Sequence, residues 1–388
     1  MEIEVRASTE LVLRTIIKYQ PVSRAATAKL TGLSKVTVSQ AVEWLLERRI
    51  VCEIGITEIS RGRPPILLTV NAEAGVIVGI EADKIASKIG VSDLNGRLLQ
   101  WEYLPPLEDN PDVFMEKLRK EIDTIRNTYQ AMPLGIVGIG FGIIGSYNEK
   151  MGIIEYIANQ SSWNEYPLQL SLESLSPGVP VRVERVAQMG AIGEAAFGNL
   201  GGMAPLVFLS SSWGTGVGVV SEGSDVKLNI GRYTRFGHTT ICFNGRRCSC
   251  GNRGCLEEYA SVRTIVSHFY PHERPSMEVF HRLVERYQQQ DPEVVSFLHK
   301  THEYLAVGVA NAINAYNPTH VCLGGLLTQM INSDDLEKIC DKVCSMVVPG
   351  HWQDVHISKS SLGEMAVLQG CFAKIRENLA AIAVVRTE

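Results

Sequence analysis

Four potential metal ligands lie within eighteen residues of this 388-residue chain: His238, Cys248, Cys250 and Cys255. One imidazole and three thiolates form a closed tetrahedral ligand set for Zn²⁺, which leaves no position for water or substrate. Gly251 and Gly254 permit a backbone turn tight enough for Cys250 and Cys255 to reach one ion. The alternative is a group of reduced thiols, or a disulfide, in a glycine-rich loop. The spacing favours a structural zinc, which would organise a neighbouring site without performing chemistry itself.

The composition describes a globular protein of two or three domains. Apolar residues make up 45% of the chain and charged residues 20%, and no apolar run approaches the ~20 residues that a membrane span needs. The N-terminal residues lack the basic-then-apolar layout of a signal peptide. Nine cysteines, three of them in the cluster, are typical of a reducing compartment. We therefore expect a cytoplasmic protein with no membrane partner.

Charge is distributed unevenly along the chain. Residues 1–72 carry ten Lys or Arg against seven Asp or Glu, a net charge of +3. The remaining residues carry 27 against 35, a net charge of −8 within the overall −5. A small basic segment ahead of a larger acidic body indicates that only the basic segment binds polyanions such as nucleic acid.

The basic segment has the pattern of a helix-turn-helix. Apolar spacing predicts a first helix over 8–19, and Ser23 is positioned to cap a short helix over 24–30. After a glycine-containing turn, Ser34 is positioned to cap a third helix over 35–48. The first turns of that helix would enter a major groove, where cationic and short polar side chains reach base edges. The DNA-binding residues expected in this unit are Arg24, Lys35, Thr37, Ser39 and Gln40.

A basic hairpin follows the helices. Residues 50–58 and 66–70 read as two strands, and Arg61 and Arg63 flank a glycine at the tip between them. An extended Arg-Gly-Arg-Pro segment is narrow enough for an A·T-rich minor groove, whose negative potential attracts arginine. The alternative is a solvated charged turn beside a generic three-helix unit. Together the pattern predicts a winged helix-turn-helix that binds double-stranded DNA through Arg61 and Arg63 as well.

The rest of the chain alternates strands with helices, which indicates two α/β lobes. Residues 141–145 read as a glycine-rich turn, and Gly214-Thr215-Gly216 as a second one. The strands are expected at 76–79, 88–91, 97–99, 135–140, 180–184, 206–210 and 320–323, with a turn and a further strand within 211–220. The main helices are expected at 187–197, 306–316 and 364–385.

The order of these motifs, ending in Cys-x-Cys-Gly-x-x-Gly-Cys-Leu-Glu, resembles the ROK family (repressor, open reading frame, kinase) over nearly the whole chain. The likeness is to its transcriptional-repressor branch, related to the xylose and N-acetylglucosamine repressors. It implies a winged helix-turn-helix over 1–72 and a two-lobed actin-like ATPase, or sugar-kinase-like (ribonuclease H-like), body. The first lobe would span 73–195 with a returning helix in 361–388, and the second, with the zinc loop, 196–360.

Two departures from the family's kinases argue against phosphoryl transfer. Their phosphate cradle reads Asp-x-Gly-Gly-Thr, whereas residues 81–85 here read Glu-Ala-Asp-Lys-Ile, so Asp83 would repel a phosphate. Their catalytic Asp lies in Glu-Asn-Asp-Ala-Asn, whereas 184–188 read Glu-Arg-Val-Ala-Gln. Val186 cannot accept a proton, and a missing general base alone costs ~10²–10⁴ in rate. We therefore expect a sensor and not an enzyme.

The resemblance also implies an effector pocket. His238 and Glu257 match family residues that hold sugar hydroxyls, while Arg185 and Arg235 replace an Asn and a Glu. Asn159 would border this pocket, with Trp163 either a second contact or a core residue. Two desolvated arginines need anions. They would pair internally with Glu184 or Glu257, or bind an anionic effector, or mark a lost pocket.

The sequence therefore predicts a DNA-binding repressor of carbohydrate metabolism with a sugar, sugar phosphate or sugar acid as effector. It would bind a pseudo-palindromic operator as a homodimer or tetramer, with zinc as its structural cofactor. A bifunctional ATP-dependent sugar kinase is one alternative. Regulation by a docked protein is another, for which the exposed edge would be Phe243, Asn244, Arg246 and Arg247.

Overall fold

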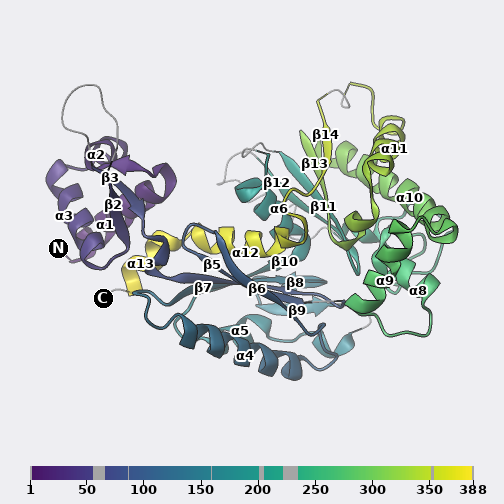
Figure 1. The fold of residues 1–388 in the computed structure, drawn as a ribbon, viewed down its shortest axis with the longest axis horizontal. Coiled ribbons are helices and arrows are strands. Elements are labelled where there is room, and N and C mark those ends of the chain that lie inside the picture. Colours follow the sequence, from purple (N-terminus) through teal and green to yellow (C-terminus); the bar gives the residue numbers. More distant parts are fainter. Residues whose placement is uncertain are drawn as a thin grey trace.

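The computed structural model has a small N-terminal unit joined to a two-lobed body (Figure 1). Each lobe of the body is built on its own sheet, and the last helix of the chain packs on the N-terminal unit. Within the described residues, every helix is too short or too polar to cross a membrane. The structure describes residues 2–55, 66–85, 87–158, 160–200, 205–221, 235–350 and 354–386.

The N-terminal unit is a helix-turn-helix beside a small antiparallel sheet. Ser23 accepts a hydrogen bond from the amide of Ala26, and Ser34 one from Thr37, so both predicted N-caps are confirmed. Gly32 ends the short helix with φ 72°, a left-handed conformation that favours glycine. The first helix begins earlier than predicted, at Glu2. The elements are α1 (Glu2–Tyr19), β1 (Val22–Ser23), α2 (Arg24–Thr31), α3 (Lys35–Glu47), β2 (Val51–Ile54) and β3 (Leu67–Val70), with sheet order β1-β3-β2.

The first lobe contains a five-stranded sheet with order β10-β7-β4-β5-β6. Its strands β4, β7 and β10 are parallel, while β5 and β6 add antiparallel strands at one edge. Helices α4 and α5 cover one face and α12 lies on the other (Figure 1). The bounds are β4 (Val76–Ala82), β5 (Ser87–Asp93), β6 (Leu98–Leu104), α4 (Pro111–Thr128), β7 (Ile136–Ile143), β8 (Ser146–Asn148), β9 (Ile153–Tyr156), α5 (Leu168–Leu175) and β10 (Val181–Arg185).

The predicted glycine-rich turn at 141–145 is wrong over its first three residues, which continue strand β7. Phe141 is fully buried in the lobe's core. A Cβ on Gly142 would lie 2.8 Å from a methyl carbon of Val367 in α12. The glycine therefore serves the close approach of a helix to the sheet and not a turn.

The second lobe contains a four-stranded sheet with order β12-β11-β13-β14. Helix α10 begins fourteen residues before its predicted start, because Asp291 caps the amides of Glu293 and Val294 and Pro292 occupies the first turn. The bounds are β11 (Leu206–Ser211), β12 (Thr215–Val220), α7 (Glu257–Ala260), α8 (Val262–Phe269), α9 (Met277–Gln288), α10 (Pro292–Tyr316), β13 (His320–Gly324), α11 (Ser333–Cys344) and β14 (His356–Lys359).

Helix α6 (Val186–Phe197) connects the two lobes. It packs on β11 and β12 of the second sheet and against α12 (Ala366–Arg376) of the first. Gly193 and Gly370 allow this close packing, because a Cβ on either would clash with the backbone of the opposite helix. Helix α6 is therefore in direct contact with both lobes.

The predicted single C-terminal helix is broken into α12 and α13 (Leu379–Arg386). Helix α13 packs on α1 of the N-terminal unit (Figure 1). Leu379 and Ala383 are buried in the same apolar cluster as Leu13 and Ile16 of α1. The N-terminal unit therefore shares a hydrophobic core with the body.

Candidate ligand pocket, metal cluster and nucleic-acid interface

The four predicted metal ligands converge on one point. Their ligand atoms all lie within 4.8 Å of one another. The Sγ of Cys248 is 3.5 Å from Nδ1 of His238, and the Sγ atoms of Cys250 and Cys255 are 3.7 Å apart. A tetrahedral zinc site has N···S edges of about 3.6 Å and S···S edges of about 3.8 Å, from its bond lengths of 2.0–2.3 Å. The donor set and its spacing fit Zn²⁺.

The disulfide alternative is wrong in this structure. A disulfide needs an S–S distance of about 2.05 Å, and all of these cysteines are free. Gly251 and Gly254 both have positive φ, 92° and 71°, as the predicted tight turn requires. A side chain on Gly254 would also clash with the carbonyl of Cys242. Both glycines therefore shape the loop that brings the thiols together.

A cavity of about 400 Å³ lies beside this cluster, between the two lobes. Its lining includes four of the residues predicted for the effector pocket, and Asn159 lies outside the described residues. His238 belongs to both the metal cluster and the cavity wall. Since its Nδ1 faces Cys248, its Nε2 is the atom left to meet a ligand. These four lining residues are Arg185, Arg235, His238 and Glu257.

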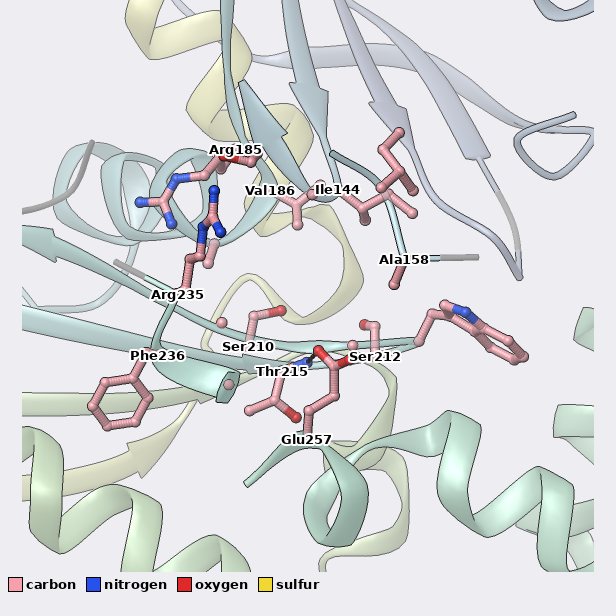
Figure 2. Close-up of a pocket in the computed structure, with 18 of the residues that line it drawn as sticks. Ile144, Ala158, Arg185, Val186, Ser210, Ser212, Thr215, Arg235, Phe236 and Glu257 are labelled. Carbon is pink, nitrogen blue, oxygen red and sulfur yellow. Dashed lines mark hydrogen bonds between the residues drawn. The ribbon is translucent and has the colours of Figure 1, made fainter. Parts of the chain in front are cut away.

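Two arginines, one from each lobe, line this cavity. Arg185 ends strand β10 of the first sheet, and Arg235 precedes the short 3₁₀ helix η3 (Phe236–His238), which packs on β12 of the second. Figure 2 shows the side chains of Arg185 and Arg235 extending into the cavity from the two walls. Burial lowers the pKa of Arg185, and the Glu184 carboxylate opposes this shift.

The predicted internal pairing of these arginines is seen only for Arg185. Its Nε lies 4.0 Å from Oε1 of Glu184, a long contact. Glu257 is engaged elsewhere, because its Oε2 accepts the amide of Thr215 at 3.1 Å and its Oε1 lies 3.8 Å from Arg263. Among the described residues, no carboxylate forms an ion pair with Arg235.

A carboxylate, Asp83, and an apolar side chain, Val186, stand where the family's kinases have the phosphate cradle and the general base. Asp83 is buried and its Oδ1 accepts the amide of Ile85 at 2.9 Å. Burial raises the pKa of Asp83 to about 6. Val186 begins α6 and lines the cavity as an apolar side chain (Figure 2). Neither residue supplies the phosphate cradle or the general base that phosphoryl transfer needs.

Some lining residues were missed by the sequence analysis. Ser210, Ser212 and Arg263 line the cavity, and no local motif distinguishes them. Trp163 is instead fully buried in the first lobe's core, where its Nε1 donates to the carbonyl of Glu108. Of the two roles left open for Trp163, the structure therefore supports the core.

The predicted DNA-contact residues of α3 lie on its solvent-facing first turns. Lys35 and Gln40 are exposed, and Thr37 and Ser39 are half-buried. Val36, which the sequence analysis missed, is 67% exposed on the same turn, where an apolar group suits a thymine methyl. Arg24 donates to Glu53 at 3.0 Å within the unit. The wing residues Arg61 and Arg63 lie outside the described residues.

Residues 77–378 match the model of the ROK family. The chain is 30% identical over 365 residues to the xylose repressor of Bacillus subtilis strain 168, covering 94% of each chain. It is 24% identical to a glucokinase of Streptomyces coelicolor, covering 78% of this chain and 98% of that one.

A solved structure of a ROK family transcriptional regulator, a homolog of the Escherichia coli Mlc protein, superposes with a TM-score of 0.77. It is 24% identical, and the match covers 99% of this chain and 98% of that one. The predicted fold class is confirmed by this likeness, which includes the N-terminal unit.

Proposed function

This chain belongs to the ROK family, and we propose that it is a DNA-binding transcriptional repressor of carbohydrate metabolism. A sugar or sugar derivative would bind the cavity between the lobes and control operator binding. The observation that carries the proposal is that apolar Val186 stands where the family's kinases have their catalytic general base. The same chain also has a helix-turn-helix with N-capped helices. The full-length likeness to the xylose repressor of Bacillus subtilis supports the same function.

The cleft is proposed to bind without catalysing phosphoryl transfer. Phosphoryl transfer relies on positioned backbone donors, a metal-bound nucleotide and a base or orienting group for the nucleophile. Here Asp83 places a carboxylate at the cradle and Val186 a methyl-bearing side chain at the base. The nearby Lys88 is held by Glu81, at 2.9 Å, and by the carbonyl of Glu364.

Zinc is proposed as the structural cofactor. His238, Cys248, Cys250 and Cys255 would hold it as a closed set, so the ion would supply rigidity and no reactive water. That rigidity would fix His238 with Nε2 towards the ligand. The adjacent helix α7 begins with Glu257, so the same loop would position a carboxylate for ligand hydroxyls.

We propose that closure of the cleft reaches the DNA-binding unit through three helices. Arg185 precedes α6, α6 packs on α12, and the α13 helix that follows packs on α1. Two winged units, residues 1–72 of each chain in a homodimer or tetramer, would read a pseudo-palindrome. Movement of α13 would alter their spacing, and the ligand's preference for one state would set the change in DNA affinity.

The proposal is tested by selecting duplexes from a random library with the purified protein, then measuring affinity across a salt series. We expect one pseudo-palindromic sequence to be enriched. Lys35→Ala and Arg63→Ala should each lower the salt slope by roughly one. Lys120→Ala on the distant helix α4 is the matched control and should leave the slope unchanged. Failure to enrich any sequence would contradict the proposed function.

Two alternatives have distinct outcomes. A bifunctional sugar kinase would release ADP in the presence of ATP, Mg²⁺ and a sugar. A protein-controlled regulator would use the zinc-loop edge, where Phe243 is 86% exposed. Arg246 of that edge is instead bound to the carbonyl of Glu258 at 2.8 Å and stacks on Tyr259. A pull-down in which the wild type captures a partner protein and the Phe243→Ala variant does not would favour the protein-controlled regulator.

A further inference from the structure

Helix α3 buries one side in the core of the N-terminal unit and exposes the other. The buried side consists of Val38, Ala41, Val42 and Leu45. On the opposite side, exposed residues recur at i, i+4, i+7 and i+11, which places them in one line along the helix. We call this line the reading stripe, and its members are Val36, Gln40, Glu43 and Glu47. The stripe therefore begins with two uncharged side chains and ends with two acidic ones.

The acidic half of the reading stripe is unsuited to deep contact with DNA. The side chains of Glu43 and Glu47 are 66% and 75% exposed, and their ion pairs are long, 3.7 Å to Arg24 and 3.8 Å to Arg48. In a groove, both carboxylates would face the phosphates that line its walls. Residues 35–42 contain no Asp or Glu. The first two turns are therefore the part of α3 that can lie in a major groove.

The cap of the helix engages one side chain of these two turns. The hydroxyl of Ser34 accepts the amide of Thr37 at 3.1 Å and lies 2.8 Å from the hydroxyl of Thr37. Thr37 therefore serves the start of the helix. Lys35 carries a flexible point charge that suits a phosphate. Val36 and Gln40 are the members of the reading stripe that remain to contact bases.

Val36 has the chemistry of a thymine reader. It is 67% exposed, and a β-branched side chain in a helix has one strongly preferred rotamer, so its two methyl groups are held in place. The C5-methyl of thymine is the apolar group that base pairs present in the major groove. At guanine, adenine or cytosine, Val36 would cover a donor or an acceptor without bonding to it, which costs free energy.

Gln40 complements Val36 on the same face. Its side-chain amide can donate to N7 of adenine while it accepts from N6, a pairing that no other base offers. Residues at i and i+4 have Cβ atoms about 5–6 Å apart, and successive bases of a strand are about 3.4 Å apart. The two side chains therefore reach bases that lie within about two base pairs of each other.

We propose that Val36 and Gln40 are a reading pair that determines the operator sequence. Val36 binds the methyl group of a thymine, and Gln40 binds an adenine at most about two base pairs away. This inference rests on the proposed function and specifies the DNA that the N-terminal unit selects. The side chains of Glu43 and Glu47 mark where the base contacts of α3 end.

The test of Val36 replaces each thymine of the selected duplex in turn by deoxyuridine, which removes the methyl group alone. Fluorescence anisotropy at fixed salt measures the affinity of the full-length protein. We expect one position in each half-site where the replacement weakens binding roughly 3- to 5-fold, the value of one buried methyl group. Val36→Ala should bind the thymine and deoxyuridine duplexes equally well at that position. If no thymine position distinguishes the wild type from Val36→Ala, the inference is overturned.

The test of Gln40 replaces each adenine by 7-deazaadenine, which removes the N7 acceptor. One replacement should weaken binding by the wild type roughly 5-fold and leave binding by Gln40→Ala unchanged. That adenine should lie within about two base pairs of the thymine that Val36 reads. A sensitive adenine four or more base pairs away, or none, would contradict the reading pair.

Two controls separate base reading from stability and from phosphate contact. Val36→Ala should not lower the urea midpoint, because alanine has a higher helix propensity than valine. It should also leave the salt slope unchanged, because valine contacts no phosphate. Leu30→Ala removes another exposed apolar side chain of the unit, 50% exposed at the end of α2, and should keep the full response to deoxyuridine.

The outcomes distinguish this inference from the proposed function. If a duplex is enriched but no base position depends on Val36 or Gln40, the DNA-binding repressor stands and the reading pair falls. If no duplex is enriched, the proposed function fails, and the reading pair fails with it.

Discussion

Lys88 donates to Glu81 at 2.9 Å, and both side chains are at most 10% exposed. This ion pair joins strands β4 and β5 next to the turn that connects them, where the family's kinases have their phosphate cradle. Burial alone would lower the pKa of Lys88, but the Glu81 carboxylate raises it above its ordinary value. The lysine therefore remains charged at neutral pH and stays bound to its carboxylate.

Removing one member of this pair should be costly. Lys88→Met leaves Glu81 buried without its cation and should lower the free energy of unfolding by about 3–5 kcal/mol. The double variant Glu81→Met/Lys88→Met should recover most of that loss. Urea denaturation measures both. Lys117→Met, which breaks the half-exposed pair with Glu108, is the control and should cost no more than about 1 kcal/mol.

The zinc content of the protein should fall when a cysteine of the metal cluster is replaced and stay the same when a cysteine outside the cluster is replaced. Cys248→Ala should lose the metal, of which the wild type should hold about one equivalent, and should melt at a lower temperature. Elemental analysis and thermal denaturation give the two readouts. Cys344→Ala removes an exposed free cysteine outside the cluster and should change neither. Full metal content in Cys248→Ala would refute the ligand set.

Asp83 should destabilise the protein as the pH rises. Its folded pKa of about 6 exceeds the reference value of 3.8, so the folded state holds the proton more tightly than the unfolded chain. The penalty for burying the carboxylate is therefore absent below about pH 4 and complete above about pH 6. Asp83→Asn should stabilise the protein at pH 8, by up to about 3 kcal/mol, and have little effect at pH 4.

The measurement for Asp83→Asn is the urea midpoint at both pH values. Asp341→Asn, which neutralises an exposed carboxylate on α11, is the control. An Asp83→Asn variant that is less stable than the wild type at pH 8 would show that the charged form makes favourable contacts in the folded state.

The contact between α13 and α1 should transmit the ligand signal. Leu379 is 1% exposed in the shared core, so Leu379→Ala should loosen that core and shrink the ligand-induced change in operator affinity. Hydrogen exchange of α1 should speed up in parallel. Val385→Ala alters a residue of the same helix that is 66% exposed and should leave both readouts unchanged. An undiminished ligand response in Leu379→Ala would exclude α13 as the relay.

Local patterns carried much of the sequence prediction. The metal ligands fall within eighteen residues, so their spacing alone indicates a common ion. The caps Ser23 and Ser34 each bond to an amide three residues ahead, which is a local signal as well. The boundaries of the lobes and the residues of the effector pocket were predicted from the resemblance to the ROK family, because no local pattern indicates them.

Long-range contacts could not be read from the sequence. Lys88 and Glu81 lie on adjacent strands, and their pairing depends on the register and on burial. The packing of α13 on α1 joins segments more than 350 residues apart in the chain. The break between α12 and α13 places α13 in that contact. Gly142 was misread because close helix packing and tight turns both select glycine.

The most direct test of the account is the affinity of the protein for its selected duplex, measured by fluorescence anisotropy with and without a saturating cleft ligand. The account predicts a shift of roughly 5- to 150-fold, the usual range of coupling between two sites. Equal affinity in both conditions, with the ligand shown by calorimetry to be bound, would contradict it.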